Sequence, residues 1–243
     1  MLRKKIVAGN WKMNNDLQET ELLINELVAE TNRCGCEVMI APSFVCLKTA
    51  IDLLIDNDIE VVSQNVHQKS SGAYTGEVSE KMLSSIGVKT TIIGHSERRE
   101  YFNETHDILK HKVDTSLENS MRIIFCFGEE LKDRKSENHF SVISNQISES
   151  LFHLKESYWK NIVLAYEPVW AIGSGLIPEQ SELIDTIDYI KGKVKGFKVL
   201  YGGSVNPKNI NNLKNINSID GFLIGGASQV SNNFIDIIKK TYN

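Results

Sequence analysis

The sequence alternates eight times between a short run of β-branched and other apolar residues and a longer segment with polar and amphipathic character. The short runs lie at residues 5–9, 38–41, 60–63, 90–94, 122–127, 162–165, 198–201 and 221–224. Apolar strands that alternate with helices are typical of a parallel sheet covered by helices. The pattern therefore predicts an α/β fold.

Three of the longer segments have the apolar spacing of an amphipathic helix. They lie at residues 16–31, 141–154 and 182–194, and each carries leucine, isoleucine or valine along one stripe. We therefore expect helices over these ranges, with the apolar stripe packed against the sheet.

The length of the chain favours closure of the sheet into a barrel. The 243 residues are close to the typical size of one (β/α)8 barrel. An open, doubly wound sheet is the alternative, but the even alternation favours the barrel. No linker, charge block or low-complexity segment divides the chain, so we expect one barrel domain over residues 1–243. In such a barrel, function lies at the carboxyl ends of the strands.

Composition and charge exclude several classes of function. The net charge is −4, which argues against a protein that binds nucleic acid or an anionic membrane through bulk positive charge. The basic start at residues 1–5 is followed by only three apolar residues, so it predicts neither a signal peptide nor a membrane span. We expect a cytoplasmic protein.

The cysteines do not have the spacing of a metal site. Cys34 and Cys36 form a C-x-C pair, and no cluster of His or Cys elsewhere completes a zinc site with them, Cys46 or Cys126. We expect reduced thiols and no bound metal.

Glycine pairs follow the seventh and eighth strands, Gly202-Gly203 and Gly225-Gly226. In many barrels the loops at these two places expose backbone N–H groups to a phosphate, and glycine lets the backbone come close. Tight turns alone are the alternative, but the further glycines at residues 173 and 175 favour phosphate binding. Residues 206–207 are expected to begin a helix here. The glycines do not form a dinucleotide fingerprint, because Pro178 stands where a third glycine belongs.

Three chemically active side chains follow three other strands. Lys12, His95 and Glu167 come after the first, fourth and sixth strands, and would converge above the barrel mouth. Taken singly, each has an ordinary structural explanation, such as a core histidine or a solvated lysine. Together they supply a base, an electrophile and a cation, which is the set needed to remove a proton next to a carbonyl.

Longer motifs around these residues resemble the triosephosphate isomerase family. They lie at residues 10–14, 64–65, 72–77, 93–99, 165–173, 201–205 and 220–228. The resemblance covers nearly the whole chain. It implies a TIM barrel that interconverts dihydroxyacetone phosphate and D-glyceraldehyde 3-phosphate through an enediol, without cofactor or metal, in glycolysis and gluconeogenesis.

The resemblance also implies the roles of the catalytic residues. Glu167 resembles the catalytic base, and His95 the neutral electrophile at the start of a short helix, whose positive end disfavours an imidazolium. Lys12 resembles the cation that binds substrate and stabilises the enediolate, and Asn10 the residue that positions it. Glu97 resembles a carboxylate that pairs with Lys12 and supports proton transfer.

Further residues resemble the substrate-binding and assembly elements of the family. The phosphate-gripping positions are Gly173, Ser204, Gly225 and Gly226, which act largely through backbone N–H groups. Residues 169–176 resemble a lid that closes over substrate. Residues 72–77 resemble the loop that enters the partner subunit of a homodimer, with Thr75 near the partner's site.

The sequence departs from the family pattern at two places. The lid continues with Leu176, Ile177 and Pro178 where a lysine and small residues are common, which affects its carboxyl-side hinge rather than the chemistry. Phe127 stands where an aliphatic residue is common, which predicts a packing change.

Two other functions compete with the isomerase. Another phosphate-binding barrel enzyme would share the glycine pairs, but would not need to combine Lys12, His95 and Glu167. A catalytically silent scaffold barrel would be expected to lack Glu167 or Lys12, and the sequence has both.

Overall fold

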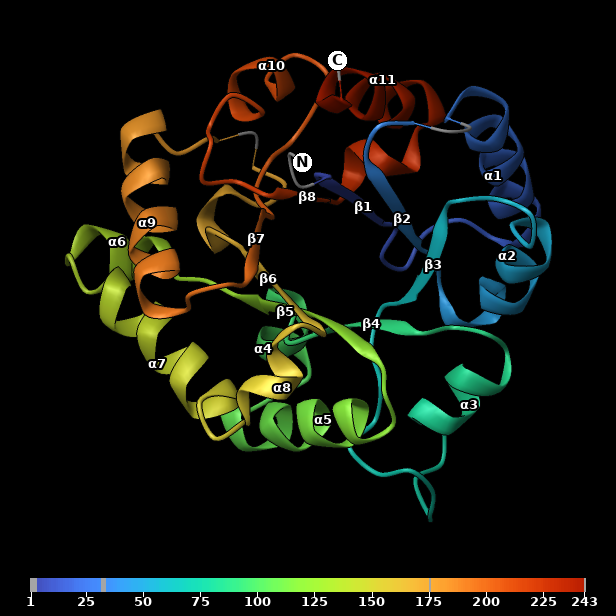
Figure 1. Cartoon of the computed structure of the whole chain (residues 1–243), viewed down its shortest axis with the longest axis horizontal. Coiled ribbons are helices and arrows are strands. Elements are labelled where there is room, and N and C mark those ends of the chain that lie inside the picture. The colour runs from blue at the N-terminus through green and yellow to red at the C-terminus, as the bar shows by residue number, and fades with distance from the viewer. Residues whose placement is uncertain (1–3, 32–33, 175, 243) are drawn as a thin grey trace.

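The eight strands are all parallel, pair in sequence order, and close into a barrel because the first strand also pairs with the last (Figure 1). This computed structural model describes residues 4–31, 34–174 and 176–242. Positions 1–3 and Gly175, which entered the sequence analysis, lie outside these ranges. The strands are β1 (Ile6–Asn10), β2 (Glu37–Ala41), β3 (Glu60–Ser63), β4 (Thr90–Ile93), β5 (Arg122–Phe127), β6 (Ile162–Tyr166), β7 (Lys198–Tyr201) and β8 (Gly221–Ile224). The predicted (β/α)8 barrel is confirmed.

The longer helices form a ring around the barrel (Figure 1). The helices are α1 (Leu17–Thr31), α2 (Leu47–Leu53), α3 (Glu80–Ser85), α4 (Ser96–Tyr101), α5 (His106–Glu118), α6 (Leu131–Lys135), α7 (His139–Leu151), α8 (Glu156–Trp159), α9 (Gln180–Lys193), α10 (Ile210–Leu213) and α11 (Ser231–Tyr242). Three 3-10 turns accompany them: η1 (Phe44–Cys46), η2 (Val169–Ala171) and η3 (Gly226–Gln229). Among the described residues, no helix is long and apolar enough to cross a membrane.

Two of the predicted helices differ from the structure by more than two residues at one end. The helix expected over residues 141–154 is α7, which ends at Leu151. Leu154 follows in a turn, where its N–H donates to the carbonyl of Leu151, yet its side chain packs on the core and so continued the apolar pattern. The helix expected to begin at residues 206–207 does not begin there. The Asn206 side chain instead accepts from the N–H groups of Lys208 and Asn209, which makes a turn before α10.

The strands pack on both faces, as their apolar sequences require. Alternate residues point inward and fill the barrel, while the residues between them meet the helices. The inward set is Ile6, Ala8, Met39, Ala41, Val62, Ile92, Ile124, Cys126, Val163, Ala165, Leu200 and Leu223, all of them buried. The interior of the barrel is therefore filled with side chains. A cavity at the rim of the barrel would have this packed core as its floor.

This packing predicts the cost of a cavity at the barrel centre. Ile124 is fully buried in the inward set, so Ile124→Ala removes contacts that the surrounding strands cannot restore. We expect the free energy of unfolding to fall by about 2–5 kcal/mol. Urea unfolding at one fixed protein concentration measures this. Leu22→Ala is the matched control, because Leu22 on α1 is 64% exposed and its truncation should change stability by under about 0.5 kcal/mol. Equal losses in the two variants would contradict the packed-core description.

Candidate active site

The polar clusters predicted at the strand ends surround one cavity of about 230 Å³ at the carboxyl end of the barrel. Its lining includes every predicted substrate-binding residue and three of the four predicted catalytic residues: Asn10, Lys12, His95, Glu167, Gly173, Ser204, Gly225 and Gly226. Glu97 lies beside the cavity and contacts it through Lys12. Eight positions that are far apart in the sequence thus come together around a space of small-molecule size.

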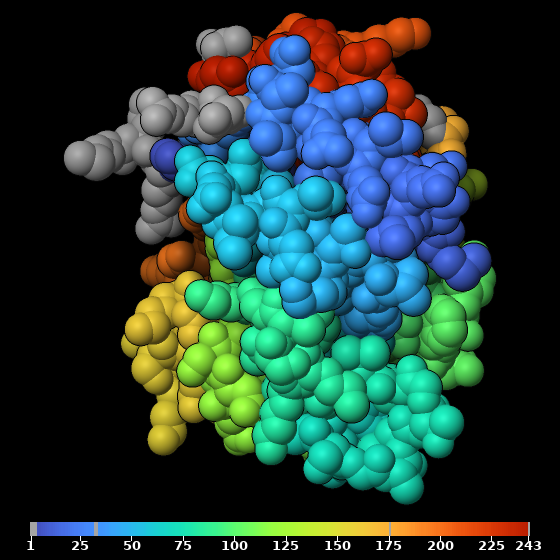
Figure 2. All heavy atoms as spheres, turned by 90° about the vertical axis from the view of Figure 1, so that its right-hand side faces the viewer, coloured from blue at the N-terminus to red at the C-terminus, as the bar shows by residue number. Residues whose placement is uncertain are grey.

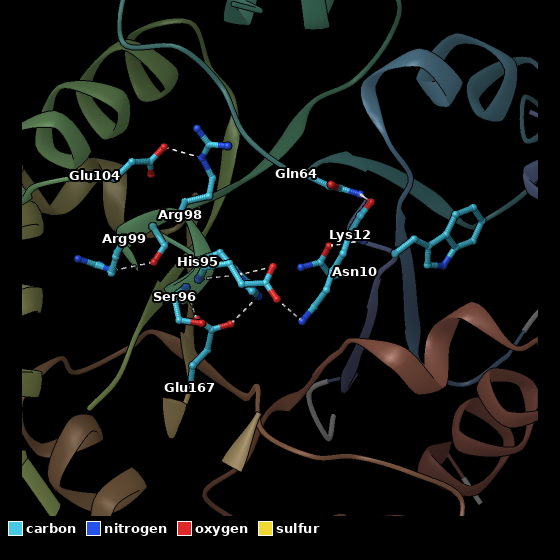
Figure 3. Close-up of polar contacts among 12 residues, drawn as sticks. Asn10, Lys12, Gln64, His95, Ser96, Arg98, Arg99, Glu104 and Glu167 are labelled. Carbon is cyan, nitrogen blue, oxygen red and sulfur yellow. Dashed lines mark hydrogen bonds and ion pairs between the residues drawn. The ribbon is translucent and has the colours of Figure 1, made fainter. Parts of the chain in front are cut away.

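His95 and Glu167 are in direct contact at the floor of this cavity (Figure 3). The Nε2 atom of His95, just after β4, lies 3.0 Å from Oε1 of Glu167, just after β6. The other carboxylate oxygen, Oε2, accepts the backbone N–H of Ser96 at 2.9 Å. Both side chains are buried, with 6% of His95 and 1% of Glu167 exposed. Burial excludes water from this pair and strengthens the electrostatic interaction between its members.

The backbone after β4 sets the tautomer of His95. His95 caps the six-residue helix α4, and its Nδ1 accepts the N–H of Glu97 at 3.3 Å. A nitrogen that accepts a hydrogen bond carries no proton, so a neutral ring has its proton on Nε2. That proton is the one that faces Glu167 and the cavity. The predicted short helix is confirmed, and its first turn contacts the imidazole through this hydrogen bond.

Lys12 has a backbone conformation that is rare for a residue with a side chain. Its φ is 55°, in the left-handed region, and strain of this kind is held where surrounding contacts compensate for it. The N–H of Lys12 donates to Oδ1 of Asn10 at 3.1 Å. Its carbonyl accepts from Nε2 of Gln64 at 2.7 Å, and the same amide donates to the carbonyl of Ala41 at 2.8 Å. Asn10 and Gln64 therefore both hold the backbone of Lys12, and sequence reasoning had left Gln64 without a role.

The Lys12 ammonium is paired with a carboxylate at the edge of the cavity. Nζ lies 2.5 Å from Oε1 of Glu97. The neighbouring Arg98 does not pair with Glu97. Its Nε donates instead to the buried Glu104 (Figure 3), which also holds Lys112 at 2.6 Å. The two adjacent residues thus face different groups, and Glu97 is left for Lys12.

Two of the glycines on the rim lie close to the side chains of Lys12 and Glu167. A Cβ on Gly225 would lie 3.3 Å from Cε of Lys12. A Cβ on Gly202 would lie 3.0 Å from Cγ of Glu167. Side chains at these positions would crowd both groups. The glycines after β7 and β8 therefore serve the catalytic side chains as well as the cavity wall.

A buried thiol lies against the Glu167 carboxylate. Burial, and then the charge of Glu167, raise the pKa of Cys126 well above its ordinary value, so this thiol stays neutral. The backbone at Cys126 is held by Arg99, whose guanidinium donates to the carbonyls of Cys126 at 2.8 Å and Gly94 at 2.7 Å. Arg99 thereby ties the ends of β4 and β5 together directly behind His95.

The first half of the predicted lid is anchored by a single buried carboxylate. Oε1 of Glu129 accepts from Arg134 at 2.8 Å, from the Tyr166 hydroxyl at 3.0 Å and from the Trp170 indole at 3.1 Å. Burial, and then the neighbouring Glu129 charge, raise the pKa of Tyr166 well above its ordinary value, so its hydroxyl remains a donor. The Ser204 hydroxyl donates to the carbonyl of Ala171 at 2.6 Å. This anchor was missed because a lone glutamate after a strand carries no distinctive pattern.

The turn after β8 completes the proposed phosphate end of the cavity. Ser228, buried in η3, donates its hydroxyl to the carbonyls of Gly225 at 2.7 Å and Ile224 at 2.9 Å. Gly173, at the other side of the cavity, has a φ of 67°. Across residues 4–31, 34–174 and 176–242, no three His, Cys, Asp or Glu side chains are grouped so that they could hold a metal ion.

Comparison with known proteins gives one consistent family. The family model described as triosephosphate isomerase matches residues 5–241. The chain is 48% identical to a triosephosphate isomerase of Flavobacterium psychrophilum and 46% identical to that of Flavobacterium johnsoniae, with 98% of this chain and 99% of each relative covered. It is 39% identical to the Clostridium tetani enzyme, over 98% of this chain and 96% of the relative. The chain therefore belongs to the triosephosphate isomerase family.

Proposed function

We propose that this chain is the glycolytic isomerase that interconverts dihydroxyacetone phosphate and D-glyceraldehyde 3-phosphate, through an enediol and without metal or cofactor. The observation that carries the mechanism is the buried contact between Nε2 of His95 and Oε1 of Glu167, at 3.0 Å. This contact supports an assignment in which Glu167 is the base and His95 a neutral N–H donor beside it, over one cavity. A substrate with adjacent carbonyl and hydroxyl carbons needs both groups at once.

In the proposed reaction, Glu167 removes a proton from one substrate carbon while the Nε2 proton of His95 polarises the carbonyl oxygen. The enediolate then takes the proton back on the neighbouring carbon. In the free enzyme the Glu167 carboxylate accepts the Ser96 N–H, so substrate binding must turn it from that N–H towards the carbon. Gly202 leaves the space in which the side chain turns.

Lys12 and Glu97 balance charge during these transfers. The Lys12 ammonium stabilises the negative oxygen of the enediolate. Glu97 holds that ammonium in the free enzyme and lies 3.6 Å from Nδ1 of His95. It can therefore release Lys12 to the substrate while protons move between the two substrate oxygens.

The phosphate is assigned to the glycine-rich side of the cavity, at Gly173, Ser204, Gly225 and Gly226. These positions bring backbone close to the cavity without side-chain bulk. Closure of residues 169–176 over the phosphate would exclude water. It would also keep the enediolate from expelling its phosphate group.

We also infer a homodimer in which residues 72–77 carry Thr75 towards the partner's site. The connection between β3 and α3 projects beyond the ring of helices in Figure 1 and occupies the lower end of the face in Figure 2. A second hollow of about 330 Å³ beside Lys12 and Glu97 offers a receiving surface. The large apolar side chains Met13 and Phe102, which line it, are 94% and 62% exposed. Exposed apolar surface of this kind marks an interaction site. In a dimer with C2 symmetry, this surface would be buried on both subunits.

We place the enzyme in the cytoplasm. All four cysteines are free, which suits a reducing compartment, and the substrates are charged metabolites of glycolysis. A coupled assay in both directions with the two triose phosphates tests the proposed activity directly. No turnover of either substrate by the purified protein would reject it.

Replacing Glu167, the proposed base, should slow the reaction. Glu167→Gln keeps the shape of the side chain but removes the proton acceptor, so kcat should fall by about 10²–10⁴-fold with a much smaller change in KM. Glu100→Gln is the matched control, because Glu100 is exposed on α4 and does not line the cavity. Near-normal turnover by Glu167→Gln would eliminate this residue as the base.

Replacing Lys12, the proposed cation, should slow the reaction and weaken phosphate binding. Lys12→Met keeps much of the side-chain stem but removes the charge, so kcat should fall by about 10²–10³-fold and binding of inorganic phosphate should weaken. Lys48→Met removes a lysine that also forms an ion pair, with Asp52 at 2.5 Å, but on the exposed surface of α2. It should leave both quantities unchanged. Equal behaviour of the two variants would make Lys12 an ordinary surface lysine.

Removing the loop at residues 72–77 should disrupt the proposed dimer. Replacing residues 72–77 with a short polar turn should give a monomer with strongly reduced kcat, because each site loses the partner's Thr75. Light scattering and the coupled assay measure assembly and activity on the same sample. Thr75→Ser should remain a dimer, since it keeps the hydroxyl and the loop. A fully active monomer would show that the loop does not organise the site.

A further inference from the structure

Cys34 and Cys36 form a pair of thiols in contact at the amino-terminal end of β2, the end of the barrel opposite the active-site cavity. Their Sγ atoms are 3.7 Å apart, and the Cys34 thiol donates to the carbonyl of Cys36 at 3.4 Å. The mechanism proposed above uses neither residue. The pair therefore calls for a separate explanation.

The two thiols differ in exposure, and both differ from the remaining cysteines. Cys34 is partly exposed, whereas 5% of Cys36 is exposed and Cys46 and Cys126 are fully buried. A dissolved reagent can thus reach Cys34 first. Cys36 lies behind it, out of reach of the reagent but in contact with the sulfur that the reagent would modify.

We infer that this pair is a thiol–disulfide exchange site that reacts reversibly with low-molecular-weight disulfides such as oxidised glutathione. The Cys34 thiolate attacks one sulfur of the glutathione disulfide, forms a mixed disulfide, and releases one glutathione thiolate. The Cys36 thiolate then attacks Sγ of Cys34, closes the Cys34–Cys36 disulfide, and releases the second glutathione thiolate. The two protons lost by the cysteines are taken up by the two glutathione thiolates, and the two electrons from the cysteines reduce the glutathione disulfide.

The local geometry permits closure with a small movement. The two sulfurs must approach by roughly 1.7 Å to reach the disulfide bond length of about 2.0 Å. Gly35 lies between them and has the backbone freedom that a ring with one intervening residue requires. Glu37, the next residue after Cys36, is held by Arg122 and by Lys198 at 3.3 Å. These contacts fix the chain on the β2 side of the pair, so closure need not disturb the strand.

The same geometry makes the exchange reversible. So short a ring departs from relaxed disulfide geometry, and strained disulfides are more readily reduced. Burial, and then the nearby Cys34, raise the pKa of Cys36, so this thiol is protonated before the exchange begins and Cys34 is the thiol that reacts first. These features fit a disulfide that forms and is reduced again as the ratio of oxidised to reduced low-molecular-weight thiols changes. They do not fit a permanent structural crosslink.

The experiment treats the purified wild-type enzyme with oxidised glutathione, followed by mass spectrometry of the intact chain and of its non-reduced peptides. We expect the loss of two hydrogens, a Cys34–Cys36 disulfide in the peptide map, free thiols at Cys46 and Cys126, and unchanged kcat. Reduced glutathione in excess should restore the original mass. Cys36→Ser should stop at the first step and retain one glutathionyl group on Cys34, whereas Cys34→Ser should gain neither a disulfide nor an adduct.

Three outcomes would overturn this inference, and each is read on the wild-type chain without relying on the folding of a variant. The first is a stable glutathionyl group on wild-type Cys34. The second is a disulfide that maps to Cys46 or Cys126. The third is four unmodified thiols under conditions that oxidise a small dithiol reagent. Loss of kcat on closure would also contradict the separation of this pair from the catalytic end of the barrel.

Discussion

Pairing of β1 with β8 is the interaction on which the rest of the structure depends. Four residues of β1, Ile6 to Gly9, are in register with four residues of β8 and turn a row of strands into a ring. In an open sheet, groups that follow β1, β4 and β6 would lie along a line. Closure instead directs Lys12, His95 and Glu167 towards one cavity, whose wall also includes the glycine turns after β7 and β8.

Within that cavity, two glutamates with the same chemistry have different surroundings. Glu97 is partly exposed and paired with the Lys12 ammonium, whereas Glu167 is buried and contacts a neutral imidazole and a backbone N–H. A cation beside a carboxylate stabilises its charge and weakens it as a base. In the free enzyme the Lys12 ammonium is paired with Glu97 rather than with Glu167. The separation of these two pairs supports the proposal that Glu167 is the base and that Glu97 assists it.

The sequence predicted the barrel and the main groups of its site because both depend on local patterns. Apolar strands are readable from residue type, and β3, β5, β7 and β8 have the predicted bounds. The roles of Gln64 and Glu129 depend on partners far away along the chain, such as the carbonyl of Lys12 and the indole of Trp170, and no periodicity reports such contacts. The contact between Cys34 and Cys36 is local, yet their side-chain directions depend on how the chain enters β2.

The proposed lid departs from the family pattern at Leu176, Ile177 and Pro178, which lie at its carboxyl-side end. The first end is fixed by Trp170 on Glu129 and by Ala171 on Ser204, next to the assigned phosphate position. The second end meets α9, where Glu179 and Glu182 form a capping box that fixes the start of the helix. Pro178 fixes its own φ just before that box, so rotation on this side must be confined to fewer residues. Since the phosphate position belongs to the first end, the change at the second end bears on the rate of opening and closing and leaves the proton transfer itself intact.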